Sequence, residues 1–77
     1  MSTSEIWHEF QPRLRAFVLK NVKNTALADD ITQEIFAKIH TQLPSLKQTS
    51  KLTSWVFQIA RNTVIDHFRK HKHSEDL

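Results

Sequence analysis

Apolar residues recur at helical spacing in three stretches of this 77-residue chain. In residues 4–22 and 25–42 the large apolar side chains stand mostly three or four positions apart, and in residues 51–72 they gather on one side of a helical projection. The residues that set these patterns are Trp7, Phe10, Leu14, Phe17 and Val18, then Leu27, Ile31, Ile35, Phe36 and Ile39, then Leu52, Val56, Phe57, Ile59, Ala60, Thr63, Val64 and Phe68. The sequence therefore predicts an all-α protein, a compact three-helix bundle whose helices span about residues 4–22, 25–42 and 51–72.

Two polar residues stand where the first two helices are expected to begin. Ser4 and Thr25 carry the short hydroxyl side chain that is favoured at a helix N-cap. Asp29 and Asp30 lie near the start of the second helix, where the helix dipole favours a carboxylate. We therefore expect Ser4 and Thr25 to be the N-caps of the first and second helices.

The connector between the second and third helices has the sequence TQLPSLKQTS (41–50). Pro44 disfavours helical geometry at the preceding Leu43, and the serine and threonine residues favour turns and caps. A short helical turn fits inside this segment. Because connectors of this length in compact domains are often functional, we expect a functional loop here.

The chain contains no glycine and no cysteine. Phosphate-binding loops and dinucleotide-binding folds need glycine, so these enzyme classes are excluded, as are disulfides and thiolate zinc sites. His67 and His71 stand four positions apart, but the sequence arranges no third ligand with them, and we expect no metal, no cofactor and no enzymatic activity. Neither a long apolar run nor a signal peptide is visible, which fits a cytoplasmic protein without a membrane partner.

The charged residues are unevenly distributed along the chain, whose net charge is +3. Lys and Arg predominate in residues 51–73, whereas Asp and Glu predominate in residues 25–40. A basic end and an acidic middle indicate two partners of different kinds, although solvated helix faces explain the charges equally well.

The side of the third helix that lies opposite its apolar arc has an unusual composition. A helical projection places there Trp55, Gln58, Arg61, Asn62, Ile65, Arg69 and Lys72. In a structural interpretation, Trp55 packs on the end of a neighbouring helix and the rest form an ordinary polar face. In a functional interpretation, the cations contact phosphates, Asn62 hydrogen-bonds a base edge and Trp55 stacks on an unpaired base. The composition of the helix leaves both interpretations open.

Two motifs, DDITQEIFAKIH (29–40) and LTSWVFQIARNTVIDHFRK (52–70), together resemble region 2 of bacterial sigma factors, in particular the extracytoplasmic-function (ECF) group. The family pattern is roughly D-[LI]-x-Q-E-x-F, then W-[LV]-[FY]-x-I-A-R-N, then an Asp and a basic helix end. The matching positions are Asp30, Ile31, Gln33, Glu34 and Phe36, then Trp55, Val56, Phe57, Ile59, Ala60, Arg61, Asn62 and Asp66. The resemblance implies one sigma-factor region 2 domain over residues 1–72, with a frayed tail or the start of a linker at residues 73–77.

The resemblance further implies that this domain binds the RNA polymerase core during transcription initiation. In the family, the Asp-x-x-Gln-Glu surface docks on the clamp coiled coil of the largest catalytic subunit, which corresponds here to Asp30, Gln33 and Glu34. These residues are neighbours on a helix surface, so they are expected to form one polymerase-binding patch.

The resemblance also implies that the third helix recognises and helps to melt the promoter −10 element. In the family, a base flipped from the single-stranded non-template strand enters a pocket made by the loop before this helix and by its first turns, here about residues 44–53 with Trp55, Arg61 and Asn62 beside them. Asn62 is then expected to contact a base edge, and Trp55 to be the junction wedge or a pocket wall. The expected DNA-binding residues are Lys51, Trp55, Gln58, Arg61, Asn62, Arg69, Lys70 and Lys72, with Lys51, Arg69, Lys70 and Lys72 on phosphates.

The sequence departs from the family pattern in LKQTSKLTSW (46–55), which lacks the glycine and the aromatic residue that often precede the tryptophan. Region 4, which reads the −35 element in the family, has no counterpart in this chain, so we expect an N-terminal domain of a longer factor, with an anti-sigma factor considered as a further partner.

Two other hypotheses stay open. A small helical repressor would prefer intact duplex DNA, and a helical protein-interaction domain would lose nothing when Arg61, Asn62 and Arg69 are replaced.

Overall fold

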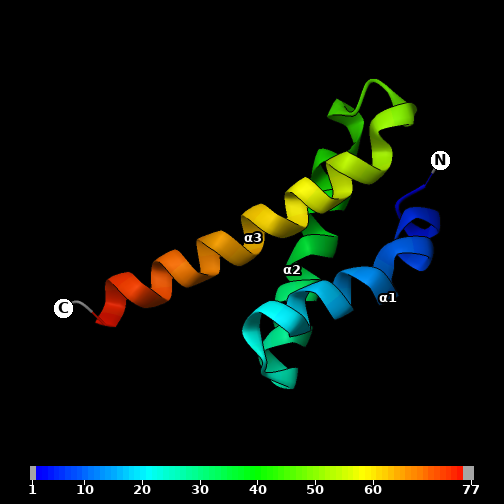
Figure 1. Cartoon of the computed structure of the whole chain (residues 1–77). Coiled ribbons are helices and arrows are strands. Elements are labelled where there is room, and N and C mark those ends of the chain that lie inside the picture. The colour runs from blue at the N-terminus through cyan, green and yellow to red at the C-terminus, as the bar shows by residue number, and fades with distance from the viewer. Residues whose placement is uncertain (1, 76–77) are drawn as a thin grey trace.

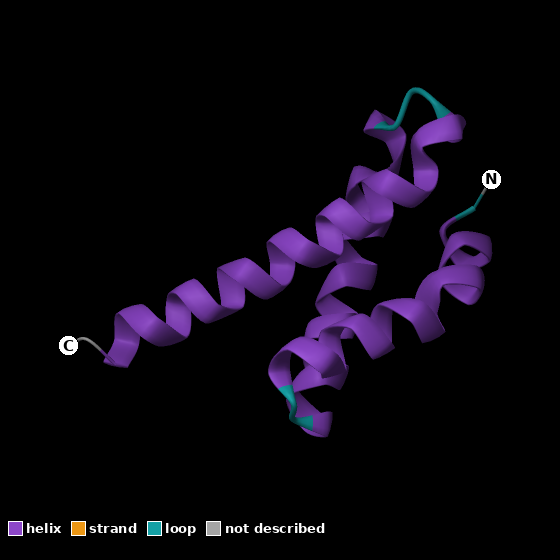
Figure 2. Cartoon of the chain, viewed as in Figure 1, coloured by secondary structure: helices purple, strands orange, loops and turns teal. Residues whose placement is uncertain are grey.

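The computed structural model describes the backbone of residues 2–75 and the side chains of residues 2–70. It contains three α-helices, α1 (Thr3–Val22), α2 (Thr25–Gln42) and α3 (Leu52–Glu75), with two 3-10 turns, η1 (Leu43–Ser45) and η2 (Thr49–Lys51), between α2 and α3 (Figure 1). No strand occurs within residues 2–75 (Figure 2). The predicted all-α fold of three helices is confirmed, and α3 runs to Glu75, beyond its expected end at about residue 72.

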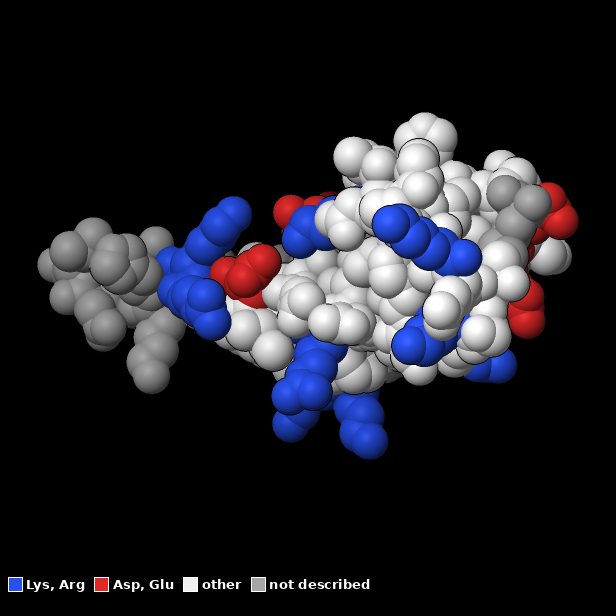
Figure 3. Space-filling model, turned by 90° about the horizontal axis from the view of Figure 1, so that it is seen from above, with Lys and Arg blue, Asp and Glu red and all other residues white. Residues whose placement is uncertain are grey.

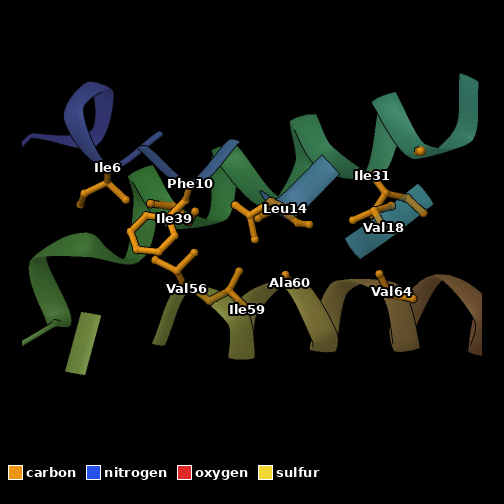
Figure 4. Close-up of a cluster of buried hydrophobic side chains, with 12 residues drawn as sticks. Ile6, Phe10, Leu14, Val18, Ile31, Ile39, Val56, Ile59, Ala60 and Val64 are labelled. Carbon is orange, nitrogen blue, oxygen red and sulfur yellow. The ribbon is translucent and has the colours of Figure 1, made fainter. Parts of the chain in front are cut away.

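The three helices pack around one elongated core, in which each helix contacts the other two. The buried apolar residues are Ile6, Phe10, Leu14 and Val18 of α1, Ala28, Ile31, Ile35 and Ile39 of α2, and Val56, Ile59, Ala60 and Val64 of α3 (Figure 4). Trp7, Phe17 and Leu27 are only half-buried at the margin of this core. The helical periodicity therefore identified the right faces and overestimated the burial at their edges.

The C-terminal part of α3 extends beyond α1 and α2 (Figure 1). Val64 is the last described residue of α3 that is buried, and Phe68, one turn later, is 45% exposed. The prediction that Phe68 belongs to the apolar arc of the third helix is therefore wrong with respect to burial.

The N-cap of α1 is Ser2 and not Ser4. The Ser2 hydroxyl accepts a hydrogen bond from the Glu5 backbone N–H at 3.3 Å, and the Glu5 carboxylate accepts one from the Ser2 N–H at 3.2 Å. This reciprocal arrangement is a capping box, which satisfies two N–H groups at the helix start. The hydrogen bonds from the Ser2 side chain and backbone lower the pKa of Glu5 below its ordinary value. The expected cap was wrong because Ser2 has a glutamate three positions later to complete the box, and Ser4 does not.

The N-cap of α2 is Asn24, one residue before the predicted Thr25. The Asn24 side-chain oxygen accepts from the Leu27 N–H at 3.0 Å. Asp29 and Asp30 consequently lie in the second turn, beyond the first turn in which a carboxylate interacts most strongly with the helix dipole. Asp29 instead pairs with Arg15 of α1, whose Nε lies 2.8 Å from its carboxylate.

The connector contains two helical turns, where the sequence predicted room for one. Leu43 is helical (φ −53°, ψ −41°), contrary to the expectation from Pro44, and it continues α2 directly into η1. Leu43 packs against the core and its carbonyl accepts from the Leu46 N–H at 3.0 Å. Core packing and this turn therefore outweigh the conformational preference of a residue before proline.

Candidate functional surfaces

The solvent-facing side of α3 carries polar side chains next to the aromatic ring of Phe57. Val56, Ile59, Ala60 and Thr63 point into the core, so the residues on the opposite side of the helix face solvent. A hollow of about 460 Å³ lies on that side, lined by Ser54, Phe57, Gln58, Arg61, Asn62 and Ile65. We call it the helix hollow. The structure therefore brings together Gln58, Arg61 and Asn62, three of the predicted DNA-binding residues.

Phe57, which lines the helix hollow, packs against aromatic residues of α1. Its ring centroid lies 6.2 Å from that of Phe10 and 6.3 Å from that of Phe17, and both pairs meet edge to face. Aromatic pairs in this geometry attract each other beyond the burial of their area. The α1–α3 contact thus holds the wall of the hollow in place.

A second hollow of about 290 Å³ lies where the connector meets the start of α3. It is lined by Ser45, Leu46, Lys47, Gln48, Lys51 and Trp55, and we call it the loop hollow. Trp55 is half-buried and packs against the core, so its indole is a fixed wall. Trp55 and Lys51 therefore lie at one hollow, while Arg61 and Asn62 lie at the other.

Sequence reasoning did not single out Lys47 and Gln48 as candidate site residues. Both are exposed and line the loop hollow. The signal was present in the connector, whose LKQTSK segment concentrates polar and basic residues between Pro44 and the third helix. Only the two turns η1 and η2 show that this segment folds back against Trp55.

The remaining predicted DNA contacts follow α3 away from the bundle. Arg69 and Lys70 are both exposed, and the side chain of Lys72 lies outside the described residues. Figure 3 shows Lys and Arg side chains at many places on the visible face of the molecule, and Asp and Glu side chains at fewer. This part of α3 offers positive charge to a ligand that extends beyond the two hollows.

The predicted polymerase-binding residues lie on the solvent side of α2, where Asp30, Gln33 and Glu34 are all exposed. Asp30 and Glu34 also line a third hollow of about 280 Å³, together with Leu27, Ile31 and His67. Gln33 does not line it. We call this space the acidic hollow. His67 comes from α3, and no local sequence pattern could have paired it with residues of α2.

A hydrogen bond ties α2 to the helix that carries the polar face. The Lys38 ammonium donates to the Thr63 hydroxyl at 3.1 Å, and that hydroxyl donates to the Ile59 carbonyl at 2.7 Å. Thr63 is fully buried and precedes Val64, the last buried residue of α3 among those whose side chains are described. The register of α3 on α2, and with it the outward direction of Asn62, is therefore fixed by both apolar and polar contacts.

Within the described residues, no three His, Cys, Asp or Glu side chains are grouped to hold a metal ion. The sequence analysis also considered His67 and His71 as a pair of metal ligands. The side chain of His71 lies outside the described residues. Over the same part of the chain, none of the helices has the length and apolar character needed to cross a bilayer.

Known proteins are similar to this chain in sequence. The model of the Sigma-70 region 2 family matches residues 6–74. The RNA polymerase sigma factor SigZ of Bacillus subtilis (strain 168) is 36% identical over 77 residues, which are 100% of this chain and 44% of that protein. The ECF RNA polymerase sigma factor SigM of the same organism is 38% identical over 72 residues, 94% of this chain and 44% of that protein.

A third relative, the RNA polymerase sigma factor HrpL of Pseudomonas syringae pv. syringae, is 40% identical over 57 residues, 74% of this chain and 31% of that protein. The chain thus spans less than half the length of each of these relatives. No solved structure matches it significantly. The family match covers nearly the whole chain, and the resemblance to ECF sigma factors is confirmed by these relatives: the chain belongs to the Sigma-70 region 2 family.

Proposed function

We propose that this chain is the part of a sigma factor that docks on the RNA polymerase core and recognises the promoter −10 element as single-stranded DNA. In this proposal the domain acts by binding and not by catalysis, and it acts in the cytoplasm, where the polymerase meets the chromosome. An anti-sigma factor that covers either binding surface would inhibit it.

The observation that carries the proposal is the solvent face of α3, where Arg61 and Asn62 border a hollow with an aromatic wall. A guanidinium binds a phosphate strongly, and an amide can donate to and accept from a base edge. Both side chains stand on a helix whose opposite face is buried, so their positions are set by the core.

The loop hollow supports the proposal that the target is single-stranded DNA. A base that leaves the stack loses a few kcal/mol of stacking and pairing. Stacking on an aromatic side chain returns about 1–3 kcal/mol per base, and the fixed indole of Trp55 offers such a platform. Trp55 is therefore proposed as a pocket wall. Lys51, Arg69, Lys70 and Lys72 are proposed to contact phosphates, with Gln58 beside the bases.

The acidic hollow supports the polymerase-binding role of α2. Asp30 and Glu34 stand one turn apart over the apolar side chains of Leu27 and Ile31. A cationic side chain of the clamp could lay its aliphatic stem on this floor and its charge against the carboxylates. We propose that Asp30, Gln33 and Glu34 form the docking patch and that His67 borders it.

Fluorescence anisotropy with labelled −10 oligonucleotides tests the DNA role. The chain should bind the single non-template strand more tightly than the same sequence as a duplex. Asn62→Ala should reduce discrimination among single-stranded sequences, whereas Arg69→Ala should weaken all of them similarly and lower the salt dependence. A preference for the duplex would instead favour a repressor-like protein, and no effect of either change would favour a protein-interaction domain.

Capture by the isolated clamp coiled coil tests the docking role. The double change Asp30→Asn with Glu34→Gln removes both charges and keeps the side-chain sizes, and it should abolish binding while the circular dichroism spectrum stays helical. Glu9→Gln, an exposed glutamate on α1, is the matched control and should bind normally. Equal binding by both variants would contradict the assignment of the patch.

A further inference from the structure

We propose that the first helix also takes part in DNA binding, and that Arg13 of α1 contacts a phosphate of the bound strand, with Lys20 as a second contact. This inference rests on the proposed function, because it concerns the path of the same single strand beyond the helix hollow. The DNA-binding residues of the proposed function all lie on η2 or α3. Arg13 and Lys20 would extend their surface to another helix.

Three phenylalanine rings join α1 to α3 beside the helix hollow. The ring centroid of Phe57 lies 6.2 Å from that of Phe10 and 6.3 Å from that of Phe17. We call this line of contact the α1–α3 seam, and Figure 4 shows the two helices side by side along the core. Because Phe57 also lines the helix hollow, the side chains of α1 that flank Phe10 and Phe17 stand close to that hollow.

Arg13 is held at the seam by a cation–π contact. Its guanidinium carbon lies 5.5 Å from the centroid of the Phe10 ring, within the distance of about 6 Å over which an aromatic face attracts a cation. The side chain is exposed, and it forms no ion pair within the described residues. A guanidinium on an aromatic ring keeps N–H groups at the edge of its plane for a phosphate. Since the ring already restrains Arg13, less side-chain entropy is lost on binding.

A second cation of α1 lies on the same side of the helix. Lys20 is exposed and stands about two helical turns after Arg13, so the two side chains are nearly in line. Phe17, which meets Phe57, is one turn before Lys20. On the other helix, Arg61 is one turn after Phe57 and lines the helix hollow. Both helices therefore carry cations next to the seam.

The position of these cations favours the phosphate backbone of a nucleic acid as the ligand. Residues 10–23 contain no Asp or Glu, whereas Lys and Arg occur repeatedly, so no carboxylate in this stretch repels a polyanion. The seam also adjoins the helix hollow, where Asn62 is proposed to contact a base. A strand with one base in that hollow carries phosphates on both sides of the base, and the seam is the next surface on the α1 side.

Fluorescence anisotropy with single-stranded −10 oligonucleotides at several salt concentrations tests this contact. Arg13→Gln should weaken the binding of every sequence roughly 3- to 10-fold at about 50 mM salt. Loss of one phosphate contact should reduce the slope of log K against log salt by about 0.7, so the effect should be about 2- to 3-fold smaller at about 200 mM salt. Lys20→Gln should lower the slope likewise, and Arg13→Lys, which keeps a cation, should retain most of it.

Arg15→Gln is the matched control. It removes the same charge from the same helix two residues later, but the Arg15 guanidinium faces α2, where its Nε lies 2.8 Å from the Asp29 carboxylate. The affinity and the salt slope of this variant should stay close to those of the parent. Circular dichroism should show the same helical spectrum for both variants, since the replaced side chains are not buried.

The outcomes separate this inference from the proposed function. Equal effects of Arg13→Gln and Arg15→Gln would reveal a general effect of charge and overturn the inference. Unchanged DNA binding by Arg13→Gln would also overturn it, and weaker capture by the clamp in that variant would assign the seam to a protein partner. In these cases, sequence discrimination that depends on Asn62 would leave the proposed function standing. A parent chain that binds no single strand would overturn both.

Discussion

Replacing Thr63 by valine should destabilise the protein, because it removes the acceptor of the Lys38 ammonium. Thr63 is fully buried in α3, where its hydroxyl accepts from Lys38 Nζ at 3.1 Å and donates to the Ile59 carbonyl at 2.7 Å. Valine has a similar size and branching, so the change removes the hydroxyl without opening a cavity. What is lost is the polar link between α2 and α3.

The magnitude follows from the burial of the two partners. A hydrogen bond to a charged group contributes about 1.5–3 kcal/mol. Lys38 is only half-buried, so its ammonium can turn partly towards water, and we expect a loss of about 1–2 kcal/mol. For a domain of this size each kcal/mol lowers the melting temperature by about 4–8 °C, so the expected decrease in Tm is about 4–16 °C.

Thr32 provides a matched control for this experiment. It is also buried, at 2% exposure, and its hydroxyl donates to the Ala28 carbonyl at 2.6 Å, four residues earlier, as that of Thr63 does. No ammonium reaches it among the described side chains. Thr32→Val therefore loses only the bond within its own helix, which competes weakly with the backbone, and should change stability by about 0.5 kcal/mol or less.

Urea and thermal unfolding of the two variants, with a Lys38→Met and Thr63→Val double-mutant cycle, measure the link directly. The cycle should give a coupling energy of about 1 kcal/mol. Equal destabilisation by Thr63→Val and Thr32→Val, or additive effects in the cycle, would refute the reasoning and show that apolar packing alone sets the register of α3 on α2.

Three further predictions concern the bundle. Phe57→Ala should lower the free energy of unfolding, measured with urea, by roughly 2–3 kcal/mol. This is less than for a fully buried phenylalanine, because Phe57 is half-buried. A decrease of less than about 1 kcal/mol would contradict its anchoring role. Arg15→Gln should change stability by less than about 1 kcal/mol, since both partners of its ion pair are exposed to solvent; a larger loss would mean that the pair is more shielded than its exposure indicates. The lowered pKa of Glu5 means that its capping contribution is present above the ordinary glutamate pKa and is lost as pH falls through the lowered value. An NMR titration should therefore show the Glu5 pKa rising towards its ordinary value in Ser2→Ala, and an unchanged pKa would contradict the capping box.

The helices could be predicted because their signals are local. Ile31, Ile35 and Ile39 repeat at the period of one helix face whatever lies opposite them, and all three are buried. The N-caps were missed by one or two residues because several short polar side chains compete at each helix start and only the backbone geometry selects one. Leu43 shows the same limit in the connector, where packing against the core overrides the preference imposed by Pro44.

The candidate site was predictable as a set of residues but not as an arrangement. Periodicity alone placed Gln58, Arg61 and Asn62 on the solvent side of α3, since the opposite side had to be buried. It could not separate Trp55 from Asn62, because the fold of the connector creates the loop hollow beside Trp55 alone. For the same reason, the polar connector LKQTSK as a whole indicated a functional segment, but nothing in the sequence distinguished Gln48 within it.

The sequence by itself determined which segments are helical, which side of each is apolar, and where the acidic and basic residues concentrate, because these properties repeat within a few residues along the chain. The tertiary structure alone decided which surfaces meet. The crossing of α2 and α3 brings His67 to Asp30 and Glu34 and brings Lys38 to Thr63. Those contacts join residues more than twenty positions apart, and their geometry depends on how side chains of different helices interlock, which no local pattern encodes.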